Sequence, residues 1–468
     1  MEKTTGVESV LIKSLFSNRN IHLNFSGEVI ILVGENGLGK TTILNILNEI
    51  FEGTPENIVD FPLAAIEVKL LHFDNPLIFT KDSMKEFIEM RHHLLEDFEE
   101  EGLNRLIECF SETDAALSQD AATIEETLRN ILNNNPSIEN ALMAVNVSPV
   151  KLIGKWIYDF SSVFIFKRAI KRLRYNVVFL PTYRRIEADI NKAIVNTSPL
   201  YIRTGKRGSD DIRIPSSVIR SHFFSKESPM KFGMKDISDH IDRLLNDIAA
   251  ESIKGYGEVS GKMIARLLDP KPDSLNIEKI NPEQVKIILE RLGSNIPEEE
   301  RLRLEKAIET ENINENENLA YYLVALSDVY RRTEDYDIEL KSFKDEVNKF
   351  LYDKEFRYDE NHIKLGLYFN RGENKNQPIS IEKLSSGEKQ LIAILALAYL
   401  SYKRNLVFII DEPELSLSLI WQKKLLPSLR KAPNTNLIIA ATHSPFIFDN
   451  DLKAYTIGSA EYATPINN

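Results

Sequence analysis

The segment from Val29 to Thr42 reads VIILVGENGLGKTT and joins an apolar run to a glycine-rich loop and a lysine–threonine pair. It fits the pattern G-x-x-x-x-G-K-[ST], in which glycines let successive backbone N–H groups face one concavity. A helix that begins near Lys40 would add the positive end of its dipole. We therefore predict a phosphate-binding loop for ATP, with Lys40 reaching the β and γ phosphates and Thr41 binding Mg²⁺. The loop residues expected to bind the nucleotide are Gly34, Asn36, Gly37, Gly39, Lys40, Thr41 and Thr42.

Two adjacent carboxylates end a second apolar run, LVFIIDEP, from Leu406 to Pro413. A strand buried on both faces would not carry two acids without a partner, so simple solubilising charge is the weaker interpretation. We predict that Asp411 holds Mg²⁺ through water. Glu412 is then placed to accept a proton from the water that attacks the γ phosphate.

A histidine ends a third apolar run, NLIIAATHSP, from Asn436 to Pro445. A lone histidine at a strand end is more often structural than catalytic. His443, however, follows the acid pair by about thirty residues, at the end of the next predicted parallel strand. Because open α/β sheets bind ligands at the carboxyl ends of their strands, we expect His443 at the same edge as the acids.

The segment LSSGEKQ, from Leu384 to Gln390, stands at the start of a strongly apolar helix. Serine hydroxyls and free N–H groups at a helix N-terminus can bind an anion. The same letters also fit a capping box, in which serine and glutamate only close the end of the helix. The sequence alone leaves both interpretations open for Ser385, Ser386, Gly387 and Glu388.

Together these four motifs resemble, in type and order, the ABC-type ATPase heads of the SMC, RecF and OLD-like group, over about residues 8–80 and 360–460. The resemblance implies an α/β fold: an ABC-type P-loop ATPase head with a mixed sheet core and two large α-helical insertions. In that group two heads hydrolyse ATP between them. By resemblance, Ser385 and Gly387 would act on the ATP of the partner head, and His443 would sense the γ phosphate.

The chain departs from this group at two places. The usual glutamine between the lobes is not recognisable, and the segment TYRRIE, which ends at Glu187, occupies roughly its position. Glu187 is therefore our candidate for the third metal-site residue beside Thr41 and Asp411. In the loop that would cross the head interface, Leu415 to Leu417, the following residue is Ser418, where many relatives have histidine.

Hydrophobic periodicity suggests five segments in this chain of 468 residues. We expect residues 1–80 to form the N-terminal half of the head and residues 356–468 the C-terminal half. Helical patterns from 81 to 170 predict one insertion. Residues 171–190 predict a return strand and a lobe-connecting segment, and residues 191–355 a loop followed by a second helical insertion with a short hairpin.

Charge is distributed unevenly around a net value of −12. Residues 81–161 contain sixteen acids and seven Lys or Arg, whereas residues 164–220 contain thirteen Lys or Arg and four acids. We call residues 164–220 the basic belt. Most such belts are solvated helix faces or phosphate-facing loops, but contact with DNA or with an acidic partner is the alternative.

The single cysteine, Cys109, excludes an internal disulfide and a cysteine-based metal site, which favours a reducing cytoplasm. The N-terminus has no secretory or transit pattern, and no apolar run approaches the roughly 18 residues that a membrane span needs. We therefore expect a cytoplasmic protein without membrane contact.

Two classes of function remain. The chain is similar to the stand-alone ATPase subunits of bacterial anti-phage systems such as PARIS and Septu, because of its size, the LPTYRRIE segment and the two insertions. Only about twenty-three residues follow Pro445, so we expect no nuclease domain in this chain. This resemblance implies slow, regulatory hydrolysis, a homodimer of heads or a higher homo-oligomer, and a separate TOPRIM- or HNH-type nuclease as effector. The alternative is a RecF- or SMC-like ATPase of DNA repair.

Overall fold

The computed structural model describes residues 6–34, 37–71, 73–142, 148–181, 234–269, 282–292, 297–309 and 316–466. The chain divides into two compact units. The first unit, which we call the nucleotide unit, comprises Met1–Asn196 and Lys403–Asn468. The second, which we call the helical unit, comprises Thr197–Tyr402.

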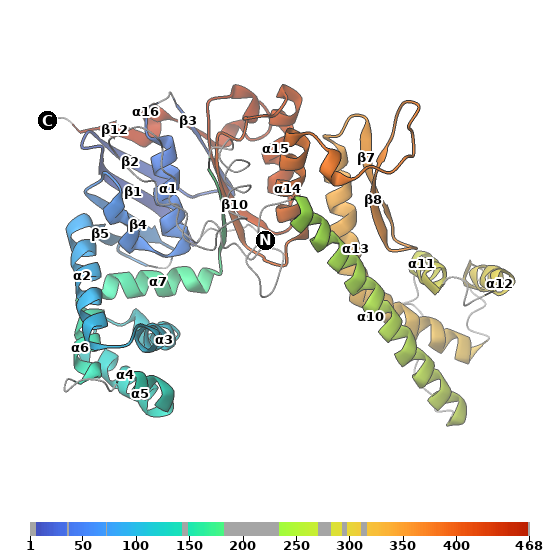
Figure 1. The fold of residues 1–468 in the computed structure, drawn as a ribbon, viewed down its shortest axis with the longest axis horizontal. Helices are drawn as coiled ribbons and strands as arrows, with labels where there is room; N and C mark the ends of the chain where they lie inside the picture. The colour runs from blue at the N-terminus through green and yellow to red at the C-terminus, as the bar shows by residue number, and fades with distance from the viewer. Residues whose placement is uncertain are drawn as a thin grey trace. The chain divides into compact units, whose positions relative to one another are not determined.

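A parallel sheet forms the centre of the nucleotide unit, with the strand order β11-β3-β10-β9-β6 (Figure 1). Its central strands read as continuous apolar runs because they are buried on both faces. The register pairs Ala441 of β10 with Asp411 of β9, and Thr442 with Val33 of β3. The carboxyl ends of these strands therefore meet at one edge. The strands are β3 (Val29–Val33), β6 (Asn176–Leu180), β9 (Leu406–Asp411), β10 (Thr435–Thr442) and β11 (Thr456–Gly458).

A second, antiparallel sheet has the order β12-β2-β1-β4-β5. Its central strand β1 alternates between buried and more exposed positions, as a sheet packed on one face requires. Helix α1 (Lys40–Glu52) packs on β6, β9 and β10, and one hydrophobic core joins α1 to both sheets. The strands are β1 (Val7–Leu15), β2 (Arg19–Asn24), β4 (Ala65–Leu70), β5 (Leu77–Thr80) and β12 (Ala463–Pro465).

Helices α2 to α7 gather below the antiparallel sheet in Figure 1. They enclose an aromatic cluster in which the ring centroids of Phe87 and Trp156 lie 4.9 Å apart and those of Trp156 and Phe164 lie 5.2 Å apart. The segments are η1 (Pro55–Asp60), α2 (Lys81–Asp97), α3 (Glu100–Ser111), η2 (Asp114–Leu117), α4 (Ala121–Asn134), α5 (Pro136–Leu142), α6 (Pro149–Asp159) and α7 (Ser161–Leu173). The C-terminal part adds α15 (Leu419–Lys431), η7 (Pro445–Ile447), η8 (Lys453–Tyr455) and α16 (Ser459–Tyr462).

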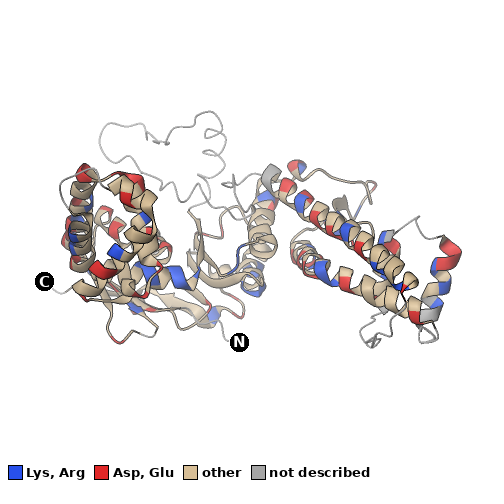
Figure 2. Cartoon of the chain, turned by 90° about the horizontal axis from the view of Figure 1, so that it is seen from below, with Lys and Arg blue, Asp and Glu red and all other residues tan. Residues whose placement is uncertain are grey.

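The helical unit is built on the antiparallel pair α10 and α13. Arg266 near the end of α10 lies 2.9 Å from Glu317 at the start of α13, and Arg332 lies 3.3 Å from Glu251. Figure 2 shows Lys, Arg, Asp and Glu interspersed along these two helices. The elements are α10 (Met234–Leu268), α11 (Pro282–Leu292), α12 (Glu298–Glu309), α13 (Glu317–Asn348), β7 (Lys354–Asp359), β8 (Lys364–Phe369), η6 (Ile381–Lys383) and α14 (Ser386–Leu400).

A buried ion pair joins α11 to α13. The Arg291 guanidinium donates to both carboxylate oxygens of Asp337, each at 2.8 Å, and the two side chains are 2% and 1% exposed. The Tyr358 hydroxyl of β7 donates to the same carboxylate. Such a pair stabilises the fold only when its remaining polar atoms are satisfied, and Thr333 supplies a further acceptor for Arg291.

None of the helices in the described ranges combines the length and the apolar character that crossing a bilayer requires.

Candidate nucleotide site

The predicted phosphate-binding loop connects β3 to α1. Gly37 and Gly39 adopt φ values of +85° and +79°, in the left-handed region that glycine enters without strain. A Cβ atom on Gly39 would lie 2.5 Å from Cε2 of Phe16, so the position also lacks space for a side chain. Glycine is therefore favoured there by its conformation, and a Cβ would in addition require the exposed Phe16 ring to move. The predicted loop residue Asn36 lies outside the described residues.

The N-terminus of α1 is open toward this loop. Its N-cap is Gly39, no side chain caps it among the described residues, and its first turn contains no acid. The first N–H groups of an α-helix have no partner within the helix. The backbone N–H groups of Lys40, Thr41 and Thr42 thus fit the oxygens of a phosphate, which is how such loops bind anions.

Lys40 lies where the phosphate-binding loop approaches the turn that carries His443. Its Nζ donates to the Gly34 carbonyl at 2.7 Å and lies 2.7 Å from Nε2 of His443. Burial lowers the pKa of the Lys40 ammonium, and the nearby carboxylates of Asp411, Glu412 and Glu414 act in the opposite direction. An ammonium can only donate, so this contact requires the His443 tautomer in which Nε2 is the acceptor.

Thr41 and Asp411 form a pair of oxygen donors. The Thr41 hydroxyl donates to Oδ2 of Asp411 at 2.7 Å, and Asp411 is 2% exposed at the end of β9. A hydroxyl and a carboxylate are the hard ligands that Mg²⁺ selects, usually together with water and phosphate oxygens. Within the described ranges no group of three His, Cys, Asp or Glu side chains could hold a metal alone. Thr41 and Asp411 would hold Mg²⁺, which when bound would neutralise phosphate charge.

Glu412 turns the chain away from β9. It has a φ of +49°, rare for a residue other than glycine, and its N–H donates to the Ala441 carbonyl at 2.8 Å. This bond extends the pairing of β9 with β10 by one residue. The acid predicted to be the general base is thus fixed by its backbone at the edge that Lys40 and His443 share. Strained conformations of this kind are typical of functional sites.

A third acid, Glu414, was not selected from the sequence. Its carboxylate accepts hydrogen bonds from the Thr442 hydroxyl at 2.7 Å, the His443 N–H at 2.8 Å and the Ser444 N–H at 3.2 Å. The signal that could have found it is its position two residues after the acid pair, in DEPEL. Glu414 therefore holds the turn that carries His443.

The LSSGEKQ motif lies in the helical unit, whereas the phosphate-binding loop lies in the nucleotide unit. Ser385 is the N-cap of α14 and forms a capping box with Glu388, whose carboxylate lies 2.9 Å from Nζ of Lys354. Ser385 and Ser386 are exposed, and Gly387 is buried. The capping interpretation is therefore observed, and the two exposed serines still stand at a helix N-terminus that can meet an anion. Glu187, the candidate third metal-site residue, lies outside the described residues.

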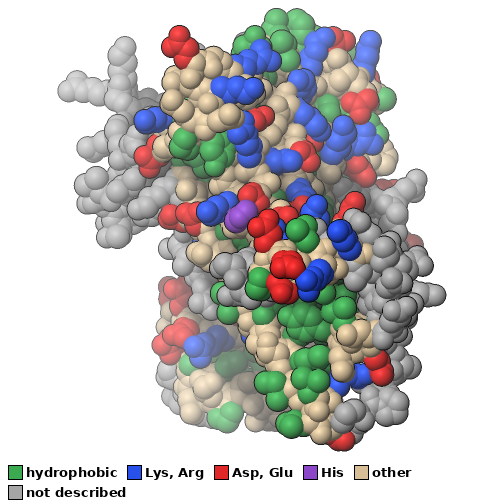
Figure 3. All heavy atoms as spheres, turned by 90° about the vertical axis from the view of Figure 1, so that its right-hand side faces the viewer, with side chains coloured by type: hydrophobic (Ala, Val, Ile, Leu, Met, Phe, Trp, Pro, Cys, Tyr) green, Lys and Arg blue, Asp and Glu red, His purple; other side chains and the backbone are tan. Residues whose placement is uncertain are grey.

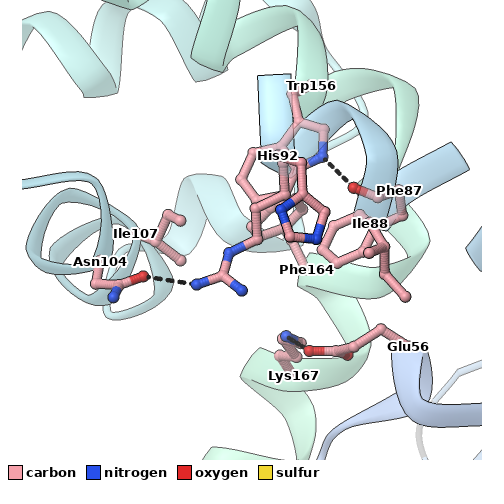
Figure 4. A pocket seen from close by; sticks show the side chains of 10 residues that line it. Glu56, Phe87, Ile88, His92, Asn104, Ile107, Trp156, Phe164 and Lys167 are labelled. Atoms are coloured by element: carbon pink, nitrogen blue, oxygen red, sulfur yellow. Dashed lines mark hydrogen bonds and ion pairs between the residues drawn. The ribbon is translucent and has the colours of Figure 1, made fainter. Parts of the chain in front are cut away.

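A cavity of about 200 Å³ lies elsewhere in the nucleotide unit, among the helices that follow β5. Figure 4 shows Lys167 beside Glu56, and the indole N–H of Trp156 donating to the Phe87 carbonyl, with Arg91 and Asn104 also lining the cavity. Lys167 and Glu56 are 2.5 Å apart. This cavity shares no residue with the predicted nucleotide site.

Comparison with known families decides the class of the chain. A family model described as AAA ATPase domain matches residues 7–448, a range that contains the phosphate-binding loop, the acid pair and His443. The chain belongs to this AAA ATPase domain family. The predicted fold class, an α/β P-loop ATPase head with parallel and antiparallel sheets and large helical insertions, is confirmed. As an ATPase domain, the chain binds nucleotide, and the site described above fits it.

Solved structures similar to this ATPase include Smc heads. One is the Smc head domain with an extended coiled coil bound to the C-terminal domain of ScpA, derived from Pyrococcus furiosus, with 15% identity, 98% of this chain and 95% of that chain covered, and a TM-score of 0.34. Another is the SmcHead bound to the C-winged helix domain of ScpA, with 12% identity, 99% and 98% covered, and a TM-score of 0.34. No curated protein matches this ATPase.

Proposed function

We propose that this ATPase is a slow, regulatory enzyme that hydrolyses ATP to ADP and phosphate in the bacterial cytoplasm. Lys40 and the first turn of α1 hold the phosphates, and Thr41 and Asp411 hold Mg²⁺, with Glu187 as a further candidate. Glu412 accepts the proton of the attacking water, and His443 senses the γ phosphate. The observation that supports these roles is the convergence of Lys40, Thr41, Asp411 and His443 at one sheet edge through two contacts of 2.7 Å.

We further propose that two chains act as a homodimer of heads, alone or within a larger homo-oligomer. The nucleotide unit supplies the loop and the acids, whereas the exposed Ser385 and Ser386 stand at the start of α14 in the helical unit. In this proposal the serines and Gly387 of one chain meet the γ phosphate bound by the other. Residues 1–80 and 356–468 then form the head, 81–170 and 191–355 are its insertions, and 171–190 connects its lobes.

The nucleotide state of the dimer would control a separately encoded toxic effector, a TOPRIM- or HNH-type nuclease, in anti-phage defence. This assignment rests on the resemblance to the PARIS and Septu ATPases. A protein partner is supported by an exposed apolar face on α10, where Ile253, Ile264, Leu267 and Leu268 are 71%, 60%, 58% and 81% exposed. Figure 3 shows hydrophobic side chains at the surface in its lower part, where α10 and α13 lie in Figure 1. Exposed apolar patches commonly mark protein interaction sites.

The structure offers less support for the DNA-repair alternative through the basic belt. In its described part, Lys167, Lys171 and Arg172 of α7 form ion pairs with Glu56, Glu112 and Asp114 at 2.5, 3.1 and 2.8 Å. Cations that are already paired release fewer counterions on binding phosphate and add less to DNA affinity. The remainder of the belt, residues 182–220, lies outside the described residues.

The proposal is tested by capturing partners of the Glu412→Gln variant, which should retain ATP and stay associated. Tagged protein is purified with ATP from cells that carry its native neighbouring genes, and the bound material is measured by mass spectrometry and mass photometry. Lys40→Ala, which loses the phosphate contact, is the matched control. A stoichiometric neighbouring protein bound to Glu412→Gln but not to Lys40→Ala supports the effector proposal.

Recovery of nuclease-sensitive DNA without a protein partner would instead favour the repair ATPase. A variant with reversed charge at Arg203, Lys206 and Arg207 tests the basic belt, since it should weaken partner or DNA binding and spare ATP binding. Unchanged binding of both would show that this part of the belt is a solvated surface.

A further inference from the structure

We infer that Glu414 and Gln422 form a relay that positions His443 and connects it to the exposed surface at Ser416–Ile420. The positioning step depends only on contacts within the nucleotide unit. The connecting step rests on the proposed function, because the occupant of that surface is a second copy of this chain in the dimer of heads.

Glu414 holds the histidine turn with both carboxylate oxygens. Oε1 accepts the N–H groups of His443 and Ser444 at 2.8 and 3.2 Å, and Oε2 accepts the hydroxyl of Thr442 at 2.7 Å. An ionised carboxylate can accept on both oxygens, whereas an amide has only one accepting atom. Glutamine in this position could accept the two N–H groups only as a neutral, weaker acceptor, and its amide would have to donate to the Thr442 hydroxyl instead of accepting from it. The carboxylate therefore fits these three donors better than an amide does.

Gln422 ties the same turn to the loop that follows the acid pair. Its Oε1 accepts the Ser444 hydroxyl at 2.6 Å, and its Nε2 donates to the carbonyls of Leu417 at 3.0 Å and Glu414 at 3.4 Å. The side chain is 7% exposed, so few water molecules can replace these bonds. If the Leu417 carbonyl moves, the Gln422 side chain must move with it to keep this bond. Because the same side chain accepts the Ser444 hydroxyl, the turn that carries His443 is displaced as well.

The loop between Glu412 and Ser418 is held in an uncommon conformation. Ser416 has a φ of +63°, and Glu412 a φ of +49°. Each such residue is strained, and surrounding contacts must offset the strain. The N–H of Leu417 donates to the Glu414 carbonyl at 3.1 Å, so the loop depends on the same residues as the relay. A loop of this kind can change position when a contact is gained or lost.

An exposed apolar surface lies directly after this loop. Ser418 caps α15 through the Trp421 N–H, and Leu419 and Ile420 are 55% and 67% exposed in its first turn. The surface is continuous with the loop residues proposed to cross the head interface. Contact by a second copy at Leu419 and Ile420 would fix the loop and, through Gln422 and Glu414, the position of His443. Partner binding and hydrolysis are thereby coupled within one head.

Glu414→Gln tests the positioning step. We expect ATP affinity within about 3-fold of wild type, because the loop and Thr41 are untouched, and turnover lowered about 10- to 100-fold, as for other outer-shell groups that orient a reactive side chain. Hydrogen exchange should show loss of protection at the His443 and Ser444 amides but not at Ile438 to Ala441 of β10. Glu373→Gln, an exposed glutamate of the helical unit, is the matched control.

A double-mutant cycle shows whether Glu414 acts through the histidine. In a His443→Ala background, Glu414→Gln should lower turnover no further, because coupled residues are not additive. Additive losses, or wild-type turnover in Glu414→Gln, would overturn the positioning role.

Gln422→Leu tests the connection to the surface, with the exposed Gln377→Leu as control. We expect the wild-type turnover per chain to rise with protein concentration as dimers form in mass photometry. Gln422→Leu should still form dimers but lose most of this rise. A wild-type protein that never dimerises contradicts the proposed dimer itself, whereas dimers of Gln422→Leu that gain turnover as the wild type does contradict the relay alone.

Discussion

Nζ of Lys40 lies 2.7 Å from Nε2 of His443, although the two residues are 403 positions apart in the chain. The contact exists because β3 and β10 are parallel neighbours, so that the loop after one and the turn after the other meet. Lys40 also donates to the Gly34 carbonyl, which places its ammonium inside the loop. Lys40 of the phosphate-binding loop and His443 of the turn after β10 are therefore in contact at the carboxyl edge of the sheet.

This contact predicts different losses for its two members. Lys40→Ala removes a charge-assisted bond to phosphate, worth about 1.5–3 kcal/mol, so ATP affinity should fall at least about 10-fold. His443→Ala leaves the loop and Lys40 in place, so affinity should change little while turnover falls. Equilibrium binding of a fluorescent ATP analogue and single-turnover hydrolysis distinguish these effects. A His443→Ala variant that binds ATP as weakly as Lys40→Ala would contradict the assignment.

The Thr41–Asp411 pair predicts a loss that depends on magnesium. Thr41→Val keeps the size of the side chain and removes the hydroxyl that lies 2.7 Å from Asp411. Affinity for ATP in the presence of Mg²⁺ should fall about 10- to 100-fold, as when a metal-site group is removed. Affinity measured with a chelator should be nearly unchanged. Thr464→Val on the edge strand β12 is the control, and equal losses with and without Mg²⁺ would argue against a metal role.

Gly39 predicts a backbone effect. Gly39→Ala places a Cβ at a φ of +79° and 2.5 Å from the Phe16 ring, so it should destabilise the protein by about 1–3 kcal/mol and weaken ATP binding. The double variant Gly39→Ala/Phe16→Ala removes the clash but not the backbone strain. Thermal unfolding and ATP binding are measured for Gly39→Ala, for Phe16→Ala and for the double variant. Wild-type values for Gly39→Ala would mean that the loop is not held in this conformation.

Glu388 predicts a stability effect that depends on pH. Burial raises the pKa of this carboxyl, but the bonds from Lys354 and from the Ser385 N–H and hydroxyl outweigh burial and hold the pKa below its ordinary value. Its stabilisation is therefore complete above the unfolded pKa, near 4.3, and is lost as pH falls through the lower folded value.

Glu388→Gln should accordingly cost about 1–2 kcal/mol at pH 7, and the difference from wild type should shrink below about pH 4. Urea unfolding at both pH values measures this difference, with the exposed Glu382→Gln as control. A loss of the same size at both pH values would show that the charge of Glu388 is not what stabilises α14.

The sequence was sufficient for the local elements of the site. Five apolar residues before Gly34, and five from Leu406 to Ile410, predict buried strands because a strand with both faces covered is apolar without alternation. Gly37 and Gly39 likewise predict a glycine-rich phosphate-binding loop, and the structure adds that both adopt a positive φ. The short strands β11 and β12 were not predicted, since three residues each carry no periodic signal and pairing with β3 and β2 holds them.

By itself, the sequence determined which groups can do chemistry: a lysine, a threonine, an acid pair and a histidine, each directly after a strand or in a loop. Only the tertiary structure decided which of them touch, because strand order and register are set by side chains packed between distant segments. It added Glu414 and Gln422, whose importance comes from the groups that they bind in the turn after β10. The contacts of Glu414 with residues 442–444 join segments far apart in the chain, so, unlike a capping box, they leave no local spacing rule, and this part of the site required the folded chain.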